Sequence, residues 1–336
     1  MLRELKLWPQ KIREGLDIAH NFHFEHSKSL PKNVKKIVFF GMGGSGISGR
    51  IIKTFFDQKK KIPTFIVDSP QVPAFVDSDT LAVVVSYSGN TWETVEALRV
   101  LATKFIPTIV LSHGGKAVEI AEAKNIPFLL LPDSKTPRSS LGTVLGILLG
   151  LFDLMGLING KEIVGALQEQ VKIYIPKFED DKSYFDDFIK YVGKSDYIHI
   201  WGVSGDSAAF AYRAQTQFNE NSKIQAVTSI FPELCHNLMV GFTKFEEKPK
   251  IIFFFTKFLS TPLELTIEAT EELLKSKGVA VYNPPVLGDT WEQELFHIII
   301  WSDFASYYLG QSRGVETAPV KIIDELKKKH TEKGIK

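Results

Sequence analysis

The chain has 336 residues, of which 44% are hydrophobic and 24% charged, and its formal net charge is +1. This length predicts two domains, and the composition excludes a disordered or fibrous protein. The charge balance provides no bulk attraction to nucleic acid, and a lone cysteine, Cys235, fits a reducing compartment. No segment reaches the roughly 18 uninterrupted apolar residues of a membrane helix, because the longest apolar stretch, at 144–158, is broken by Asp153. The charged N-terminus is not typical of a signal peptide. We therefore expect a cytoplasmic protein that binds neither nucleic acid nor a membrane.

Apolar runs alternate with helical patterns through the first half of the sequence. Residues 1–34 predict a helical segment that Pro9 interrupts or opens. Short apolar runs then predict buried strands at 36–40, 64–67, 81–85, 107–111 and 127–131. Strands that alternate with helices are typical of a parallel sheet covered on both faces. We assign the first α/β domain to residues 35–158.

The second half begins with helical patterns and then returns to strands. Two helices are expected at 141–158 and 161–171, and the charged segment 176–182 predicts a linker. Further strands are expected at 197–201, 250–255 and 279–282, with a helix over 261–277. The second domain, with its linker helices and a C-terminal helix, is assigned to residues 159–336.

Two stretches of the first half have counterparts in the second. FFGMGGSG at 39–46 parallels IWGVSGDS at 200–207, and VVVSYSGNT at 83–91 parallels FFFTKFLST at 253–261. These separations are too long for a solenoid repeat. The sequence therefore predicts a duplicated fold of two doubly wound α/β domains with parallel sheets.

A glycine-rich loop, Gly41–Gly46, follows the first strand and opens a helix. Its backbone N–H groups can approach an anion at the positive end of that helix. The same glycines match the G-x-G-x-x-G dinucleotide fingerprint, and Asp68 ends the next strand where a ribose-binding acid would lie. An NAD-dependent dehydrogenase is therefore an alternative to a phosphate site. Close packing of helix on strand, with no ligand, is a third interpretation.

A second loop, SYSGNT, favours phosphate. Ser86, Ser88 and Thr91 place three hydroxyls at the carboxyl end of a strand, where open α/β sheets bind ligands. Helix capping would explain Asn90 and Glu93 but not these hydroxyls. Hydroxyls and backbone amides at the start of a helix suit a phosphate monoester.

The matching loops of the second half lack this chemistry. Asp206 stands where its carboxylate would repel a phosphate oxygen, and residues 257–259 replace the small hydroxyl side chains. We expect only the first half to hold phosphate, with the second half supplying other parts of the site.

Several motifs together resemble a known family. The loops GMGGSG and SYSGNT are similar to those of sugar isomerase (SIS) domains, which bind sugar phosphates. With PRSSLG at 137–142, NENSK at 219–223 and PELCHN at 232–237, the chain resembles the bifunctional phosphoglucose/phosphomannose isomerase family from about residue 35 to about residue 325. The resemblance implies two SIS domains, a homodimer and isomerisation of glucose 6-phosphate, and of mannose 6-phosphate, to fructose 6-phosphate without cofactor or metal.

The resemblance also implies roles for particular residues. Glu220 would move the proton between C2 and C1 through a cis-enediolate, and His236, donated across a dimer interface, would open the sugar ring. Arg138 would stabilise the enediolate. A C-terminal lysine would contact substrate, with Lys321 and Lys327 as candidates. Phosphate would be bound by Gly44, Ser45, Ser86, Ser88 and Thr91.

Other interpretations stay open from the residues alone. Without the motifs around them, Glu220 would be interpreted as a glutamate on a helix surface and Arg138 as part of a surface salt bridge. A non-catalytic sensor of sugar phosphates is a further alternative, and it would not need Glu220 as a base. No metal is expected, because no cysteine or carboxylate set completes a site around the regularly spaced His20, His23 and His26.

Overall fold

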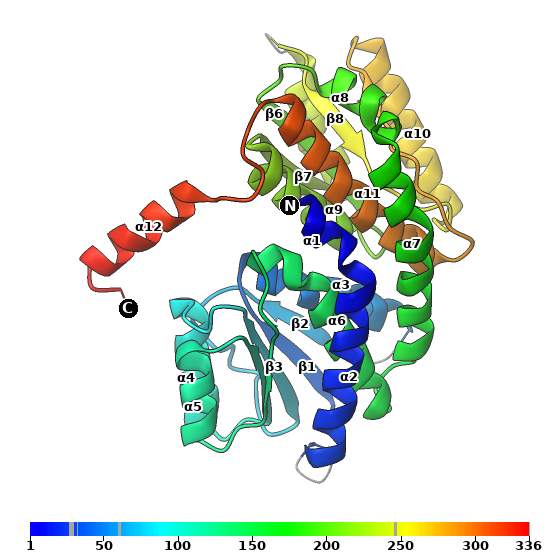
Figure 1. The fold of residues 1–336 in the computed structure, drawn as a ribbon. Coiled ribbons are helices and arrows are strands. Elements are labelled where there is room, and N and C mark those ends of the chain that lie inside the picture. The colour runs from blue at the N-terminus through cyan, green and yellow to red at the C-terminus, as the bar shows by residue number, and fades with distance from the viewer. Residues whose placement is uncertain (27–29, 32, 60–61, 245–246, 336) are drawn as a thin grey trace. The chain divides into compact units, whose positions relative to one another are not determined.

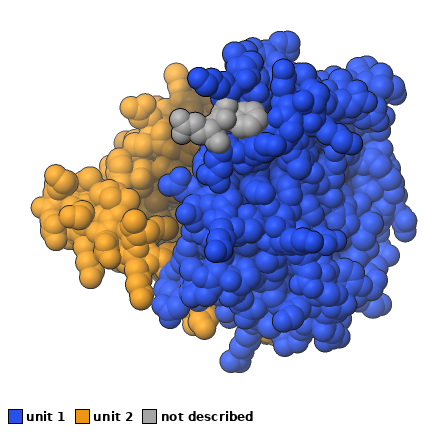
Figure 2. Space-filling view, turned by 90° about the horizontal axis from the view of Figure 1, so that it is seen from above, with its two compact units in different colours: residues 1–6, 166–319 blue, residues 7–165, 320–336 orange. Residues whose placement is uncertain are grey.

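The computed structural model describes residues 1–26, 30–31, 33–59, 62–244 and 247–335 (Figure 1). It divides into two compact units, coloured separately in Figure 2. Unit 2 contains residues 7–165 and 320–336, and unit 1 contains residues 1–6 and 166–319. The domain boundaries expected from the sequence stay predictions.

Unit 2 is built on a parallel five-stranded sheet in the order β2-β1-β3-β4-β5. The chain begins with a short helix, α1 (Leu2–Lys6), which belongs to unit 1. Pro9 lies in the first turn of the next helix, α2, which belongs to unit 2. The strands are β1 (Lys36–Phe40), β2 (Thr64–Val67), β3 (Thr80–Ser86), β4 (Thr108–Ser112) and β5 (Phe128–Leu130). The helices span Trp8–His26 (α2), Gly43–Lys59 (α3), Trp92–Thr103 (α4), Gly115–Ala123 (α5), Leu141–Leu154 (α6) and Lys321–Glu332 (α12).

Both faces of this sheet are buried, because alternate strand residues point to opposite sides. Val38 and Val84 pack in one cluster with Leu98 of α4 and Ala117 of α5. On the other face, the ring of Phe39 lies 6.2 Å from that of Phe152 in α6. Helices on both faces confirm the doubly wound α/β prediction for this half.

Unit 1 repeats the plan with a parallel four-stranded sheet in the order β7-β6-β8-β9. This order matches β2-β1-β3-β4 of unit 2, which confirms the predicted duplication. The strands are β6 (Tyr197–Val203), β7 (Gln225–Phe231), β8 (Lys250–Phe253) and β9 (Val281–Tyr282). The helices are α7 (Gly160–Asp180, beginning in unit 2), α8 (Asp186–Val192), α9 (Ala208–Gln217), α10 (Thr261–Ser276) and α11 (Trp291–Ser312). Short 3₁₀ turns occur at Pro137–Ser140, Lys182–Phe185, Glu233–His236 and Leu238–Thr243.

The predicted linker at 176–182 is wrong. Helix α7 continues through Pro176 to Asp180. Val171, Ile175 and Phe178 are buried at helical spacing, so packing of this face holds the helix together across the proline. In the part of the chain that the structure describes, no helix is long and apolar enough to cross a membrane.

Candidate active site

The glycine loop after β1 is packed closely against its surroundings. A Cβ on Gly46 would lie 2.6 Å from the carbonyl oxygen of Gly41, and one on Gly41 would lie 2.8 Å from that of Val85. These two glycines therefore have a packing role, as one of the three sequence interpretations proposed. Gly44 faces a different neighbour, because its Cβ would lie 3.4 Å from the Cα of Arg138.

A hydrogen bond joins the glycine loop to the second loop. The backbone N–H of Tyr87 donates to the Ser45 hydroxyl at 3.1 Å, and the Ser48 hydroxyl donates to the Ser45 carbonyl at 2.9 Å. Because β1 and β3 are adjacent parallel strands, both loops emerge at the carboxyl edge of the sheet. The sequence-based candidates Ser45 and Ser86 are thus brought to the same edge.

The SYSGNT loop is held tightly by β4 and the loop that follows it. Gly89 has φ +66°, and a Cβ there would lie 1.7 Å from the carbonyl oxygen of Gly114, so only glycine fits. The Ser112 hydroxyl donates to the Ser86 carbonyl at 2.7 Å. The Ser86 hydroxyl lies 3.4 Å from that of Thr91, which is the N-cap residue of α4 and makes no side-chain capping bond. The hydroxyls therefore lie beside the N–H groups of the first turn of α4.

Asn90 does not cap α4, and the predicted Asn90–Glu93 cap is wrong. The Asn90 side-chain oxygen accepts a hydrogen bond from the N–H of Lys116 at 3.1 Å, at the start of α5. Its amide nitrogen donates to the Ser88 carbonyl at 3.1 Å. Asn90 therefore fixes the shape of the loop, and capping does not account for the other polar side chains there.

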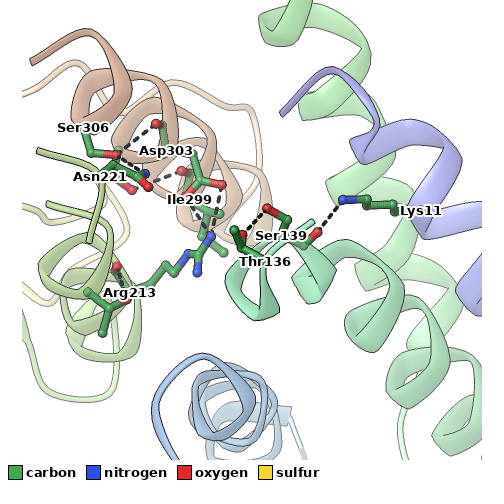
Figure 3. Close-up of polar contacts among 10 residues, drawn as sticks. Lys11, Thr136, Ser139, Arg213, Asn221, Ile299, Asp303 and Ser306 are labelled. Carbon is green, nitrogen blue, oxygen red and sulfur yellow. Dashed lines mark hydrogen bonds and ion pairs between the residues drawn. The ribbon is translucent and has the colours of Figure 1, made fainter. Parts of the chain in front are cut away.

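Arg138 lies in the turn between β5 and α6, and only 2% of it is exposed. Lys11 of α2, itself 7% exposed, donates to the Ser139 carbonyl at 2.7 Å, and the hydroxyls of Thr136 and Ser139 lie 2.8 Å apart (Figure 3). Lys11 is therefore a second buried cation, and it anchors this turn. The sequence analysis did not identify Lys11. The backbone of Arg138 lies beside Gly44, and this edge of unit 2 carries a buried arginine, a residue type that suits phosphate and carboxylate ligands.

Glu220 lies in unit 1, in a single π-helical turn, Phe218–Ser222, between α9 and β7. Such turns occur often at functional sites. The Asn219 side chain pairs with the backbone of Ala226, accepting from its N–H at 2.7 Å. Lys223 has φ +54°, and its ammonium group donates to the carbonyl of Glu220.

The same turn is anchored to α11. Asn221 donates to the Ser306 hydroxyl at 2.9 Å, and the Ser222 hydroxyl donates to the Ser306 carbonyl at 2.6 Å. One turn earlier in α11, Asp303 receives a hydrogen bond from Arg213 of α9 at 3.0 Å, and both side chains are buried (Figure 3). Glu220, partly exposed between these anchored neighbours, is therefore held at a defined place on unit 1.

His236 is exposed in the turn Glu233–His236, which follows β7. Glu220 precedes this strand, so the two residues lie at its opposite ends. With β7 spanning Gln225–Phe231, a rise of about 3.3 Å per residue separates the strand ends by roughly 20 Å. A single chain therefore does not bring Glu220 and His236 together.

The other residues considered from the sequence have simpler surroundings. Lys321 and Lys327 are exposed on α12. Asp68 forms an ion pair with Arg50 at 2.7 Å, which gives its carboxylate a structural partner. Among the described residues, no group of three or more His, Cys, Asp or Glu side chains is placed to hold a metal ion.

Comparisons with known proteins agree with this architecture. The SIS domain model matches residues 32–140, and the model of the bacterial phospho-glucose isomerase C-terminal SIS domain matches residues 192–329. The chain is 32% identical to the bifunctional phosphoglucose/phosphomannose isomerase of Caldicellulosiruptor bescii, over 96% of this chain and 97% of that protein. It is 30% identical to the protein of the same name from Thermoplasma volcanium, over 95% and 99%.

Solved structures show the same fold at lower identity. The C-terminal domain of glucosamine-fructose-6-phosphate aminotransferase from Francisella tularensis superposes with a TM-score of 0.70. It is 15% identical, and the match covers 95% of this chain and 97% of that chain. This similarity concerns the fold alone.

Proposed function

Because this chain belongs to the bifunctional phosphoglucose/phosphomannose isomerase family, we propose that it interconverts glucose 6-phosphate, and mannose 6-phosphate, with fructose 6-phosphate. The observation that carries the substrate class is the edge of unit 2, where the hydroxyl-lined SYSGNT loop opens α4 and the buried Arg138 lies against Gly44. Such a cradle suits a phosphate monoester. Gly44, Ser45, Ser86, Ser88 and Thr91 are the proposed phosphate-binding residues.

The proposed reaction moves one proton between two carbon atoms. Glu220 removes the proton from C2 of the open-chain aldose and the C1–C2 enediolate forms. The proton of the O2 hydroxyl passes to O1, and the same carboxyl group returns its proton to C1, which gives the ketose. Arg138 stabilises the negative charge on the enediolate oxygens. His236 transfers protons at the ring oxygen and the C1 hydroxyl, which opens the cyclic substrate. No electrons leave the substrate, so no redox cofactor is required. In this proposal the Arg138 guanidinium stabilises the enediolate charge that a metal ion would otherwise stabilise.

The positions of Glu220 and His236 support a homodimer. Since they lie at opposite ends of β7, a complete site in this proposal takes His236 from a second copy of the chain. Each dimer then contains two sites, each made from both copies.

A coupled assay tests the reaction. With EDTA present, fructose 6-phosphate is supplied and glucose 6-phosphate is detected with an added dehydrogenase; mannose 6-phosphate is supplied in parallel. We expect turnover of both sugars, and binding of sugar phosphate without turnover would favour the sensor instead. Saturable quenching of NADH fluorescence would favour the dehydrogenase.

Two variants separate chemistry from phosphate binding. Glu220→Gln removes the base and is expected to abolish turnover while a phosphate-bearing inhibitor still binds. Ser88→Ala with Thr91→Ala removes hydrogen bonds to a charged ligand, each worth about 1.5–3 kcal/mol, and should chiefly raise KM. Glu268→Gln in α10 is the control for loss of a carboxylate in unit 1, because Glu268 is exposed and lies outside the motifs of the proposed site. An unchanged KM in the double variant would contradict the phosphate cradle.

A further inference from the structure

We propose that unit 1 retains an anion cradle of the same design as that of unit 2, and that the carboxylates of Asp206 and Glu294 fill it. These two side chains restrict phosphate binding to unit 2 and so determine how many phosphates one chain takes. The inference goes beyond the proposed isomerisation, and it uses the proposed phosphate site of unit 2 only as the comparison.

The duplicated fold identifies the matching positions. β6 and β8 are neighbours in unit 1 as β1 and β3 are in unit 2. The parallel sequences around these strands put Asp206 at the place of Ser45. The same pairing puts Thr256 at the place of Ser86, and Lys257 at the place of Tyr87.

Asp206 takes up the donors of this edge. It is 5% exposed, and one carboxylate oxygen accepts from the backbone N–H of Thr256 at 3.1 Å. The other accepts from the Thr256 hydroxyl and from the indole N–H of Trp291, each at 2.7 Å. The hydroxyl that matches Ser86 is thus already bonded to an anion that belongs to the chain.

Glu294 takes up the next donor. This residue of α11 is 2% exposed, and its carboxylate accepts from the backbone N–H of Lys257 at 2.8 Å. That N–H matches the Tyr87 N–H, which in unit 2 donates to the neutral Ser45 hydroxyl. The Lys257 ammonium lies 3.1 Å from the second oxygen of Glu294.

Two buried carboxylates have a direct electrostatic consequence. Both carboxylates accept hydrogen bonds from donors at this edge, and the Thr256 hydroxyl that matches Ser86 is therefore not available to an entering phosphate. A phosphate dianion at this edge would also meet two like charges at short range. The cradle of unit 1 is therefore closed to phosphate by charge and by loss of donors.

The experiment removes the internal anions and counts phosphates. In Asp206→Ser/Glu294→Gln, position 206 receives the residue that unit 2 has at 45, and Glu294 loses its charge without losing volume. Isothermal titration with inorganic phosphate is expected to show one more saturable site per chain than in the unchanged protein. The result that matters is the increase in the number of phosphate sites per chain. An increase from one to two supports both the phosphate site of unit 2 and the filled cradle of unit 1. An increase from zero to one supports the proposal for unit 1 and contradicts the phosphate site of unit 2.

Two further variants keep the test decisive. Asp187→Asn/Glu268→Gln neutralises two exposed acids of unit 1 and controls for the change in net charge; it should add no site. If the first variant does not fold by circular dichroism, Asp206→Asn/Glu294→Gln preserves both side-chain volumes and should add a weaker saturable site. A folded charge-removed variant whose count does not rise overturns the proposal, as does an equal rise in the control.

Discussion

His297 is a histidine kept without charge by its surroundings. None of its side chain is exposed, and neither ring nitrogen has a hydrogen-bond partner among the described residues. Its ring packs edge-on against Tyr174 at 4.4 Å and lies 5.9 Å from Phe178. Burial lowers the pKa of His297 from its ordinary 6.5 to about 3.

This shift predicts how stability depends on pH. Above pH 6.5 the residue is neutral in both the folded and the unfolded chain, so it adds no pH dependence to the free energy of unfolding. Between pH 6.5 and about 3 the unfolded chain binds a proton that the folded chain does not, so the free energy of unfolding falls by up to about 1.4 kcal/mol per pH unit. Urea unfolding of His297→Leu should show a smaller decrease in the free energy of unfolding between pH 6.5 and 4 than the unchanged protein shows. The exposed His20→Leu should follow the unchanged protein. Parallel curves for both variants would contradict the assignment.

Single residues also mark what sequence alone could not reveal. The hydroxyls of the SYSGNT loop were identified from their type and position, because a strand followed by a helix fixes where they emerge. The roles of Asn90 and Lys11 were not identified from the sequence. Their partners, Lys116 and Ser139, are distant in sequence and are brought near only by folding.

Whole elements were predicted where their pattern is local. Strands with continuous apolar runs, such as β1 and β3, were predicted within a residue of their observed bounds. β7 was missed because its exposed and buried residues are mixed and its pairing with β6 alone makes it a strand. α11 was missed because it is buried on nearly all sides and lacks an amphipathic period.

The contact between α2 and α6 depends on glycines. A Cβ on Gly146 of α6 would lie 2.5 Å from the carbonyl oxygen of Ile12, and one on Gly15 of α2 would lie 2.2 Å from that of Thr143. Backbone atoms cannot move aside as a flexible side chain can, so the two helices would have to separate.

This geometry predicts opposite effects for two identical substitutions. Gly146→Ala should lower the free energy of unfolding by roughly 1–3 kcal/mol, as overpacking does. Gly165→Ala in α7, where an added Cβ would meet nothing within 4 Å, should raise it by about 0.5–1 kcal/mol through helix propensity. Thermal unfolding of both variants gives the comparison, and equal shifts would contradict the close approach.

The candidate site was foreseen in part at the scale of the whole chain. The two loops and Arg138 meet at one edge of unit 2, as the pattern of strands and helices predicts. Glu220 and His236 are close in sequence, yet β7 separates them. The sequence analysis did not contain this strand, so it had no physical basis for placing the two residues apart.

Their separation leads to a prediction about how copies of the chain cooperate. In the proposed dimer, Glu220 of one copy and His236 of the other complete each site. Glu220→Gln and His236→Ala dimers should therefore each be inactive or nearly so. A dimer with one copy of each variant has one site carrying both original residues and one site carrying both substitutions.

Mixing the two variants measures this sharing. Equal amounts, unfolded and refolded together, yield mixed dimers as about half of the total, each with one intact site. The mixture should recover about a quarter of the turnover of the unchanged protein, while each variant refolded alone should not. Glu220→Gln mixed with a Glu220→Gln/His236→Ala double variant is the matched control, because no pairing of these copies restores a base. If both residues served a site within one copy, every site in the first mixture would lack one of them, and mixing would restore nothing.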